Sequence, residues 1–509
     1  MNFRQAKGNK IHWLNTGIHH QFSNFLFIDK HYGSNSVLRR IFSLARKQGF
    51  QSVLIEEITE SESSLLVAEN NALRIRRPDF AKAEVHKISF FKSARDCPPA
   101  ASDFLGYVVF KRDFFSGQAN PKAHVYESVM SPFRNAEANN FIHCKKTYDI
   151  ITTLGTFSVS GVLYAQQNGH TFVCAHVAMR TALASFLPDS DITYEVLNGF
   201  AGIDHRKIQL GNGFGLGPPE MECILNGLGI SFEKLVHEPS KNLHIPIEYQ
   251  RVLYGSIESG IPALVGFELE NPAINTTGGP RHIIPAFGHT FNEDTWMPQA
   301  AREYFGGKTD GYFPSENWLS TFIVHDDNFG PYLCLPRHFL KKDYFRILYG
   351  LKFKNTTTTA IEAEAIAFEF FRAIANYAVN NEWFDRFAVF AKGSWLVLRT
   401  ILINKNDYIA HLEKARSWDQ TFLEPGALQK FRDYLPPVFW MIEASAPELF
   451  NSSRRKFGEL LLPCDQPLPK PLSPSVLLAA RLPGVIFIRK SDIEVSHTGL
   501  KGHTPLFTF

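Results

Sequence analysis

The sequence predicts an α+β fold in which one helix packs against an antiparallel sheet, with mixed α/β regions before and after this core. The helix is expected to begin near Cys174, because apolar residues then recur every three to four positions as far as Phe186. The sheet is expected from three consecutive apolar runs separated by turn-forming segments. These runs are Ile261–Leu269, Arg281–Gly288 and Leu319–His325.

The region before the core has the patterns of a mixed α/β fold. A helix is expected at Ser36–Gln48, and segments rich in β-branched and aromatic residues favour strands. The expected strands are Ser52–Ile58, Leu65–Ala68, Ala72–Ile75, Val85–Phe91 and Leu105–Lys111. The region after the core combines helical patterns with further strand-like runs. We therefore divide the chain into an N-terminal region (1–147), a core (148–336) and a C-terminal region (337–509).

Composition argues for a folded protein without nucleic-acid or membrane partners. The 53 basic and 50 acidic residues leave a formal net charge of +3, which does not favour binding to nucleic acid. No apolar signal segment is evident near Met1, and the apolar stretch Val476–Ile488 is too short and too interrupted to span a bilayer. The six cysteines are scattered without a CxxC motif. A reduced, cytoplasmic compartment is therefore expected.

Cys174 is the first candidate for chemistry. A thiol at the start of a helix feels the positive end of the helix dipole and unpaired backbone N–H groups, which favour the reactive thiolate. Gln166 and Gln167 lie just upstream, and either could donate a hydrogen bond to an oxyanion beside the sulfur. The same position also suits a buried structural cysteine, which is a common role of free cysteines. Cys144, which precedes Lys145, is the rival reactive thiol.

His282 and Asp326 complete a set of groups suited to thiol catalysis. A histidine must take and return the proton of the nucleophile, and a third polar group must orient that histidine. His282 starts one expected strand and Asp326 ends the next. If these strands are antiparallel neighbours, the two side chains lie at the same end of the sheet. Alone, His282 also suits a core position and Asp326 a turn.

These residues resemble the papain-like cysteine peptidases, closest to the bacterial branch of leader-processing, double-glycine peptidases. Four local features carry the resemblance, which covers about residues 150–335. They are Gln167 a few residues before Cys174, the helix–Gly-x-Pro–strand passage Ile257–Val265, the run His282–Gly288, and Phe322–Asp326 leading to the acidic residue.

The resemblance implies a papain-like core and an intracellular thiol hydrolase, a selective cysteine peptidase of a bacterial cytoplasm. Its implied catalytic residues are Cys174, His282, Asp326 and the oxyanion donor Gln167, with no cofactor and no metal. The implied substrate is a protein or peptide. The flanking regions would recognise the substrate or restrict access to the site, and a partner or activator protein fits this picture.

Several alternatives stay open at the level of sequence. The spacing from Gln167 to Cys174 is one residue longer than the family pattern, so Gln166 remains a candidate oxyanion donor. The long segment between His282 and Asp326 carries Asn292 and Asp294, either of which could orient the histidine. Trp296, in the same segment, suits either a substrate cleft or ordinary packing.

Three other functions compete with the peptidase. An acyl-transfer or deamidating enzyme of the transglutaminase type would use the same groups. A non-catalytic binding protein could keep the same fold. A metal site would use ligand types that the sequence also supplies. Its candidate ligands are Cys174, His176, His282, His289 and Asp326.

Overall fold

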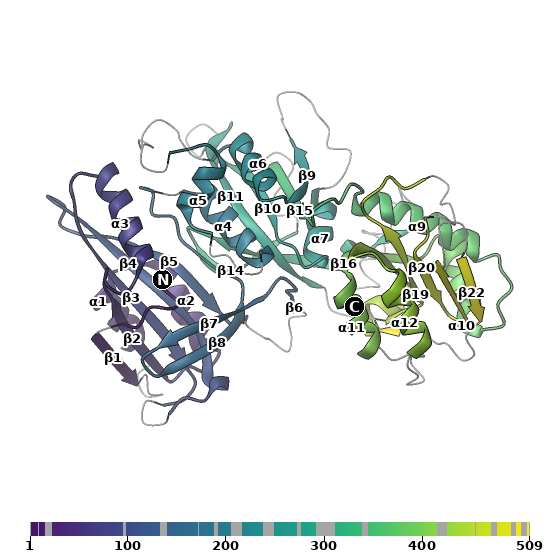
Figure 1. The fold of residues 1–509 in the computed structure, drawn as a ribbon, viewed down its shortest axis with the longest axis horizontal. Coiled ribbons are helices and arrows are strands. Elements are labelled where there is room, and N and C mark those ends of the chain that lie inside the picture. The colour runs from purple at the N-terminus through teal and green to yellow at the C-terminus, as the bar shows by residue number, and fades with distance from the viewer. Residues whose placement is uncertain are drawn as a thin grey trace.

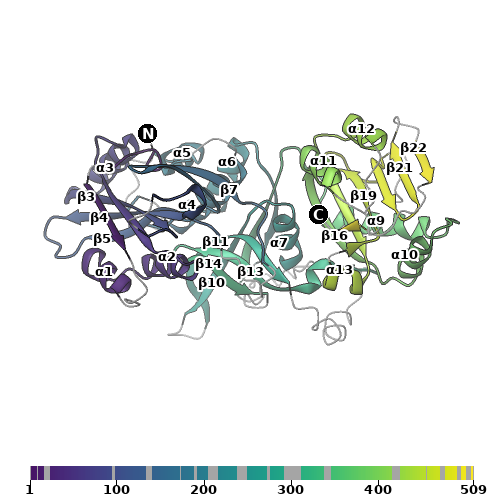
Figure 2. The ribbon, with the colours of Figure 1, turned by 90° about the horizontal axis from the view of Figure 1, so that it is seen from below.

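The computed structural model describes most of the chain. The described residues are 2–8, 10–15, 23–94, 98–132, 140–171, 173–187, 192–204, 216–237, 249–271, 276–291, 311–337, 345–414, 425–453, 455–469, 476–489, 495–499 and 506–507. Three parts follow one another along the longest axis, from the purple N-terminal part through the teal middle to the green and yellow C-terminal part (Figures 1 and 2).

The N-terminal part is an antiparallel five-stranded sheet with the order β1-β2-β3-β4-β5. Its strands are β1 (Lys10–Asn15), β2 (Ser52–Ile58), β3 (Phe80–Phe91), β4 (Phe104–Phe115) and β5 (Lys122–Met130). Its helices are α1 (Ser23–Tyr32), α2 (Ser36–Lys47) and α3 (Ser64–Arg76), and a 3-10 turn, η1, covers Ala101–Asp103. The expected strand at 52–58 and helix at 36–48 are confirmed.

Helix α3 corrects the sequence prediction, which placed two strands at Leu65–Ala68 and Ala72–Ile75. The side-chain oxygen of Ser63 accepts a hydrogen bond from the backbone N–H of Leu66 at 3.3 Å, and this cap starts the helix. Leu66 and Leu73, seven residues apart, are both buried on one helical face. A local cap and a helical spacing therefore outweigh the strand propensity of the apolar run.

The middle part is a six-stranded antiparallel path with the order β14-β13-β11-β10-β15-β9, and β6 pairs with β11. Its strands are β6 (Asn140–Phe141), β9 (Ser231–Val236), β10 (Ala263–Asn271), β11 (Thr276–Phe291), β13 (Leu319–Asp326), β14 (Gly330–Pro336) and β15 (Phe345–Lys352). Its helices are α4 (Cys174–Phe186), α5 (Tyr194–Phe200), α6 (Pro218–Gly227) and α7 (Tyr249–Glu258). The hairpin of β7 (Lys146–Thr152) and β8 (Gly155–Gly161) precedes α4.

The elements cross both of the expected region boundaries. Strand β7 begins before residue 147, and β15 lies beyond residue 336 while pairing with β10 and β9 of the middle sheet. The middle sheet therefore continues to Lys352. Long-range pairing of this kind has no signature in a local sequence window, which is why a boundary read from the sequence falls short of it.

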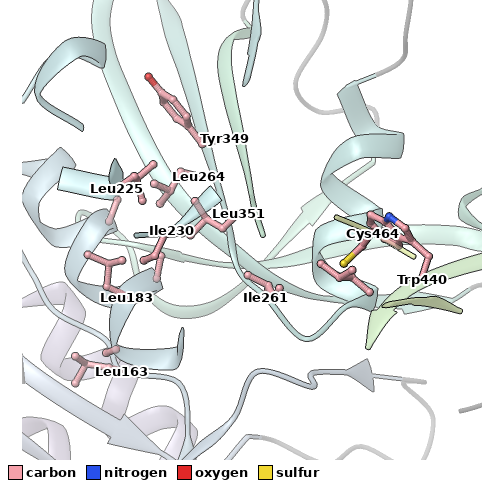
Figure 3. Packing of buried hydrophobic residues seen from close by; sticks show 14 of the residues in the cluster. Leu163, Leu183, Leu225, Ile230, Ile261, Leu264, Tyr349, Leu351, Trp440 and Cys464 are labelled. Carbon is pink, nitrogen blue, oxygen red and sulfur yellow. The ribbon is translucent and has the colours of Figure 1, made fainter. Parts of the chain in front are cut away.

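Helix α4 packs against β10 and β11, and apolar side chains fill the space between them. Figure 3 shows part of this cluster, with Leu183 from α4, Leu225 from α6 and Leu264 from β10. Leu183 and Leu264 are fully buried, and burying a leucine side chain contributes about 2 kcal/mol. The prediction of helices combined with antiparallel sheets is confirmed, and the helix that begins at Cys174 lies on the middle sheet.

The C-terminal part is a second large sheet with the order β12-β16-β17-β19-β20-β21-β22. Its strands are β12 (Phe313–Pro314), β16 (Val397–Asn404), β17 (Val438–Ser445), β19 (Gly458–Pro463), β20 (Ala479–Leu482), β21 (Val485–Arg489) and β22 (Val495–Gly499), with β18 (Arg455–Lys456) paired to β23 (Leu506–Phe507). Its helices are α9 (Ala360–Ile374), α10 (Glu382–Lys392), α11 (Lys405–Lys414), α12 (Pro425–Tyr434) and α13 (Pro447–Ser453), and the 3-10 turn η4 covers Ser315–Trp318. None of the helices in the described residues is long and apolar enough to cross a membrane.

Candidate active site

Cys174 is the first residue of α4 and is partly exposed. Val173 before it has an extended backbone, so the chain changes from an extended approach to a helix at the thiol. The first backbone N–H groups of a helix have no intrahelical acceptor, and they place partial positive charge at this end. The predicted start of the helix at Cys174 is therefore confirmed, and this end of α4 suits a developing anion.

His282 lies on β11, which pairs with β10 on one side and β13 on the other. Its ring meets the ring of Phe267 on β10 edge to face, with the centroids 5.5 Å apart. The side chain is only 10% exposed, so little water competes for its nitrogens. The side chain of Cys174 is among the groups that raise the pKa of His282, which requires the thiol to lie beside the imidazole. The structure thus brings the cysteine of α4 and the histidine of β11 together.

Asp326 ends β13, the antiparallel neighbour of β11, and its carboxylate serves two purposes. Oδ2 lies 3.2 Å from Nε2 of His282. Oδ1 accepts the backbone N–H groups of Asn328 and Phe329 at 2.8 and 3.2 Å, which fixes the carboxylate against its own turn. Since Nε2 of His282 faces the carboxylate, Nδ1 is the nitrogen left for the thiol.

The electrostatics of the site favour a protonated histidine. Burial alone would lower the pKa of His282, but the hydrogen bonds to Asp326 and Cys174 and the charges of Asp327 and Asp326 outweigh burial and raise this pKa to about 10. Burial works to raise the pKa of Asp326, yet the His282 partner and the two backbone N–H groups leave that pKa below its usual value. An imidazolium beside a carboxylate is the resulting charge pattern.

Asp327 is a second carboxylate at this histidine that the sequence prediction missed. Its Oδ1 lies 3.3 Å from Nε2 of His282, and its side chain is 3% exposed. Neither of its carboxylate oxygens has a hydrogen-bond partner among the described residues. Burial raises the pKa of Asp327 to about 6, against the opposing charge of His282. The doublet Asp326-Asp327 was the available signal, but neighbouring strand residues normally face opposite sides, and only the turn after β13 lets both reach one ring.

The two upstream glutamines have different surroundings. Gln166 is held by the N-terminal part, since its Oε1 accepts the backbone N–H of Val125 at 3.0 Å. Gln167 donates from Nε2 to Oδ1 of Asn328 at 3.2 Å, beside the turn that carries Asp326. Gln167 is therefore the glutamine that lies near the aspartates. The alternative orienters Asn292 and Asp294, and Trp296, lie outside the described residues.

The five-residue metal set suggested by the sequence is not assembled. His176 is buried with Nε2 at 2.9 Å from Asn198, and His289 is buried with Nε2 at 2.6 Å from Glu258. A smaller group of His282, Asp326 and Asp327 has ligand atoms that all lie within 4.8 Å of one another, so their types and spacing could hold a cation. A cation there would have to displace the proton of His282, because an imidazolium has no free lone pair on a ring nitrogen.

The other described thiols differ from Cys174 in burial. Cys144, the rival expected from the sequence, is buried and donates toward the carbonyl of Phe287 at 3.6 Å, and burial raises its pKa to about 12. Burial also raises the pKa of Cys464, to about 11. Cys223 and Cys334 are exposed, so accessibility makes them the competitors in any labelling experiment. Cys97 lies outside the described residues.

Comparisons with known proteins gave no match of any kind. No protein-family model, no curated protein and no solved structure matches the chain. The resemblance to papain-like peptidases thus stays a prediction.

Proposed function

We propose that the chain is a thiol hydrolase, a selective cysteine peptidase that acts on a protein or peptide substrate. The single observation that carries the proposal is the position of His282, whose Nε2 lies 3.2 Å from Oδ2 of Asp326 and whose pKa is raised by both Asp326 and Cys174. Nucleophilic thiol catalysis needs this order of groups. The papain-like relationship is part of the proposal, supported by the Cys–His–Asp order and by a cysteine-bearing helix on an antiparallel sheet.

In the proposed first half-reaction, the thiolate of Cys174 attacks the carbonyl carbon of a peptide bond and forms a C–S bond. The carbonyl electron pair moves to the oxygen, where the side-chain amide of Gln167 and backbone N–H groups at the start of α4 donate hydrogen bonds. The C–N bond then breaks as His282 gives its proton to the leaving nitrogen. The product is a thioester on Cys174 and a free amine.

In the second half-reaction, water attacks the thioester and neutral His282 takes one of its protons. The C–S bond breaks, the thiolate of Cys174 is restored and a carboxylic acid leaves. Asp326 holds the imidazole in place throughout and stabilises its protonated form. Asp327 places a second negatively charged carboxylate beside the same nitrogen, Nε2 of His282.

A cytoplasmic location belongs to the same proposal. Five described cysteines are unpaired, which is the usual state of thiols in a reducing compartment.

The proposal is tested by incubating the protein with a proteome-derived peptide library and detecting new N-termini by mass spectrometry. The wild type should produce a restricted set of cleavages, while Cys174→Ala and His282→Ala should produce none above background. Cys223→Ala, which removes an exposed thiol far from the α4 start in sequence, is the matched control and should cleave like the wild type. Wild-type cleavage that persists in Cys174→Ala would refute the assignment.

A further inference from the structure

The turn that follows β13 holds Asp326 in the orientation that His282 requires. It runs from Asp327 to Phe329 before β14 begins at Gly330. Because Oδ1 of Asp326 accepts two backbone N–H groups of this turn, a change in the turn backbone also moves the carboxylate. The orientation of Asp326 thus depends on whatever fixes the turn.

Arg40, on α2 of the N-terminal part, binds the first residues of β14, directly after this turn. Its Nε donates to the carbonyl oxygen of Pro331 and its Nη2 to that of Tyr332, each at 2.7 Å. The planar guanidinium presents these donors as a fork, which fixes both position and angle. A Cβ at Gly330 would lie 2.7 Å from Cδ of Arg40, so the approach of the arginine depends on a glycine there.

Tyr164, which precedes α4, holds the near end of the turn. Its hydroxyl donates to the carbonyl oxygen of Asp326 at 3.2 Å, and the carbonyl oxygen of Asp327 lies 3.5 Å away. Its ring packs edge to face on His325 with centroids 5.4 Å apart. The turn is therefore held at both ends by residues that precede α4.

Tyr332 shows how tightly this region is held. Its φ of 52° is in the left-handed region that non-glycine residues rarely adopt. Its backbone N–H donates to Nδ1 of His325 at 3.1 Å, and its hydroxyl donates to the carbonyl of Met130 at 2.8 Å. Such a backbone conformation persists only where surrounding contacts fix it.

We infer that Arg40 is a positioning residue of the site, which acts through the β13–β14 turn to hold Asp326 against His282. The inference rests on the proposed function, and it gives the N-terminal part a role in the chemistry in addition to any role in recognising substrate. Arg40 lies on α2, far from Asp326 in sequence, and its two acceptors are main-chain carbonyls.

The test follows the rate of Cys174 alkylation by iodoacetamide as a function of pH, resolved by mass mapping, alongside the thermal midpoint of unfolding. The described titratable groups that face His282 are Cys174 from α4, and Asp326 and Asp327 from the end of β13. A looser Asp326 holds the proton on His282 less well, which disfavours the thiolate. The acid midpoint is the pH at which the alkylation rate of Cys174 falls to half its maximum. Arg40→Met should therefore raise this midpoint by about one pH unit, so that labelling at a pH below the midpoint is about tenfold slower.

Two further variants and a control sharpen the test. Arg40→Lys keeps the charge but loses the fork, so it should restore only part of the shift. Tyr164→Phe removes one hydroxyl at the other end of the turn, leaves the packing of the ring, and should shift the midpoint in the same direction. Arg39→Met is the matched control, because Arg39 on the same helix pairs with Asp29 and should leave the midpoint unchanged.

The outcomes separate this inference from the proposed function. A raised midpoint in Arg40→Met and Tyr164→Phe, with partial restoration in Arg40→Lys, supports the inference. The inference is overturned if Arg40→Met lowers the thermal midpoint of unfolding but leaves the pH midpoint of labelling unchanged. It is also overturned if Arg40→Met is unfolded and Tyr164→Phe leaves the pH midpoint unchanged. In both cases Arg40 contributes to stability alone. Slow wild-type labelling of Cys174 at every pH overturns the proposed function, and the inference with it.

Discussion

At the scale of the residue, the charge state of His282 decides how the site behaves with pH. Its pKa is raised to about 10 in the folded protein, above the ordinary value of about 6.5. The folded state therefore binds this proton more tightly than the unfolded state. The stability that results is fully present below about pH 6.5 and is lost as the pH rises through about 10.

Asp327→Asn removes one of the two negative charges that face His282, so the pKa of the imidazole should fall. The expected change is a downward shift of about one unit, seen by NMR titration of the ring resonances. Asp149→Asn, a change at an aspartate that pairs with Ser158 on the β7–β8 hairpin, is the control and should leave the titration unchanged. An unaltered pKa of His282 in Asp327→Asn would show that the Asp327 carboxylate does not affect the protonation of the imidazole.

Individual residues also mark how far the sequence could predict the site. Cys174 and His282 are candidates at the level of sequence because a helical period begins at one and an apolar run at the other. Asp327 was missed because its approach to the ring depends on a turn, and Arg40 because its partners are backbone carbonyls 291 and 292 residues away. Contacts of that kind leave no pattern in a local stretch of sequence.

At the scale of the element, caps and local spacing explain where prediction succeeded and failed. Helix α2 is capped by Asn35, whose side chain accepts the N–H of Leu38 at 2.8 Å, and its apolar period matched the prediction. Helix α3 was mistaken for strands because Leu65, Leu66 and Val67 are contiguous and apolar. Its cap at Ser63 was the signal to weigh against that run.

Ser63→Ala should lower the free energy of unfolding by about 1 kcal/mol, because it leaves the start of α3 without its side-chain acceptor. Urea unfolding followed by circular dichroism measures the change. Ser63→Thr keeps an oxygen at the cap and should retain most of the stability. A loss in Ser63→Thr as large as that in Ser63→Ala would mean that packing at this buried position, rather than the cap, sets the stability.

At the scale of the whole molecule, a buried chain of charges joins the middle and C-terminal sheets. Glu258 at the end of α7 accepts from His289 of β11 and from Arg399 of β16, and Arg399 also reaches Glu443 of β17 at 2.9 Å. Lys456 extends this series of charges, since its Nζ donates to Oε1 of Glu443 at 2.5 Å. Burial opposes ionisation of Glu258, but the charges of Arg399 and His289 lower its pKa to about 2.

The sign of this shift predicts acid sensitivity. A carboxylate with a lowered pKa adds stability that is fully present above about pH 4.5 and is lost as the pH falls toward about 2. Arg399→Met removes the arginine that two buried carboxylates share and leaves Glu258 with His289 and Glu443 with Lys456, so it should lower the free energy of unfolding at pH 7 by about 3–5 kcal/mol. Arg386→Met, in an exposed pair with Glu382, should change it by less than about 0.5 kcal/mol. Equal losses of unfolding free energy for the two variants, measured by urea unfolding, would contradict the claim that the buried charges around Arg399 stabilise the contact between the middle and C-terminal sheets.

The measurement that tests the central claim most directly is a short pulse of dilute iodoacetamide near neutral pH, followed by mass mapping of every cysteine. Cys174 should be labelled first, ahead of the exposed Cys223 and Cys334, and His282→Ala should abolish this advantage. Labelling of Cys174 no faster than that of Cys223 and Cys334, or equally fast in His282→Ala, would contradict the claim that His282 activates the thiol of Cys174.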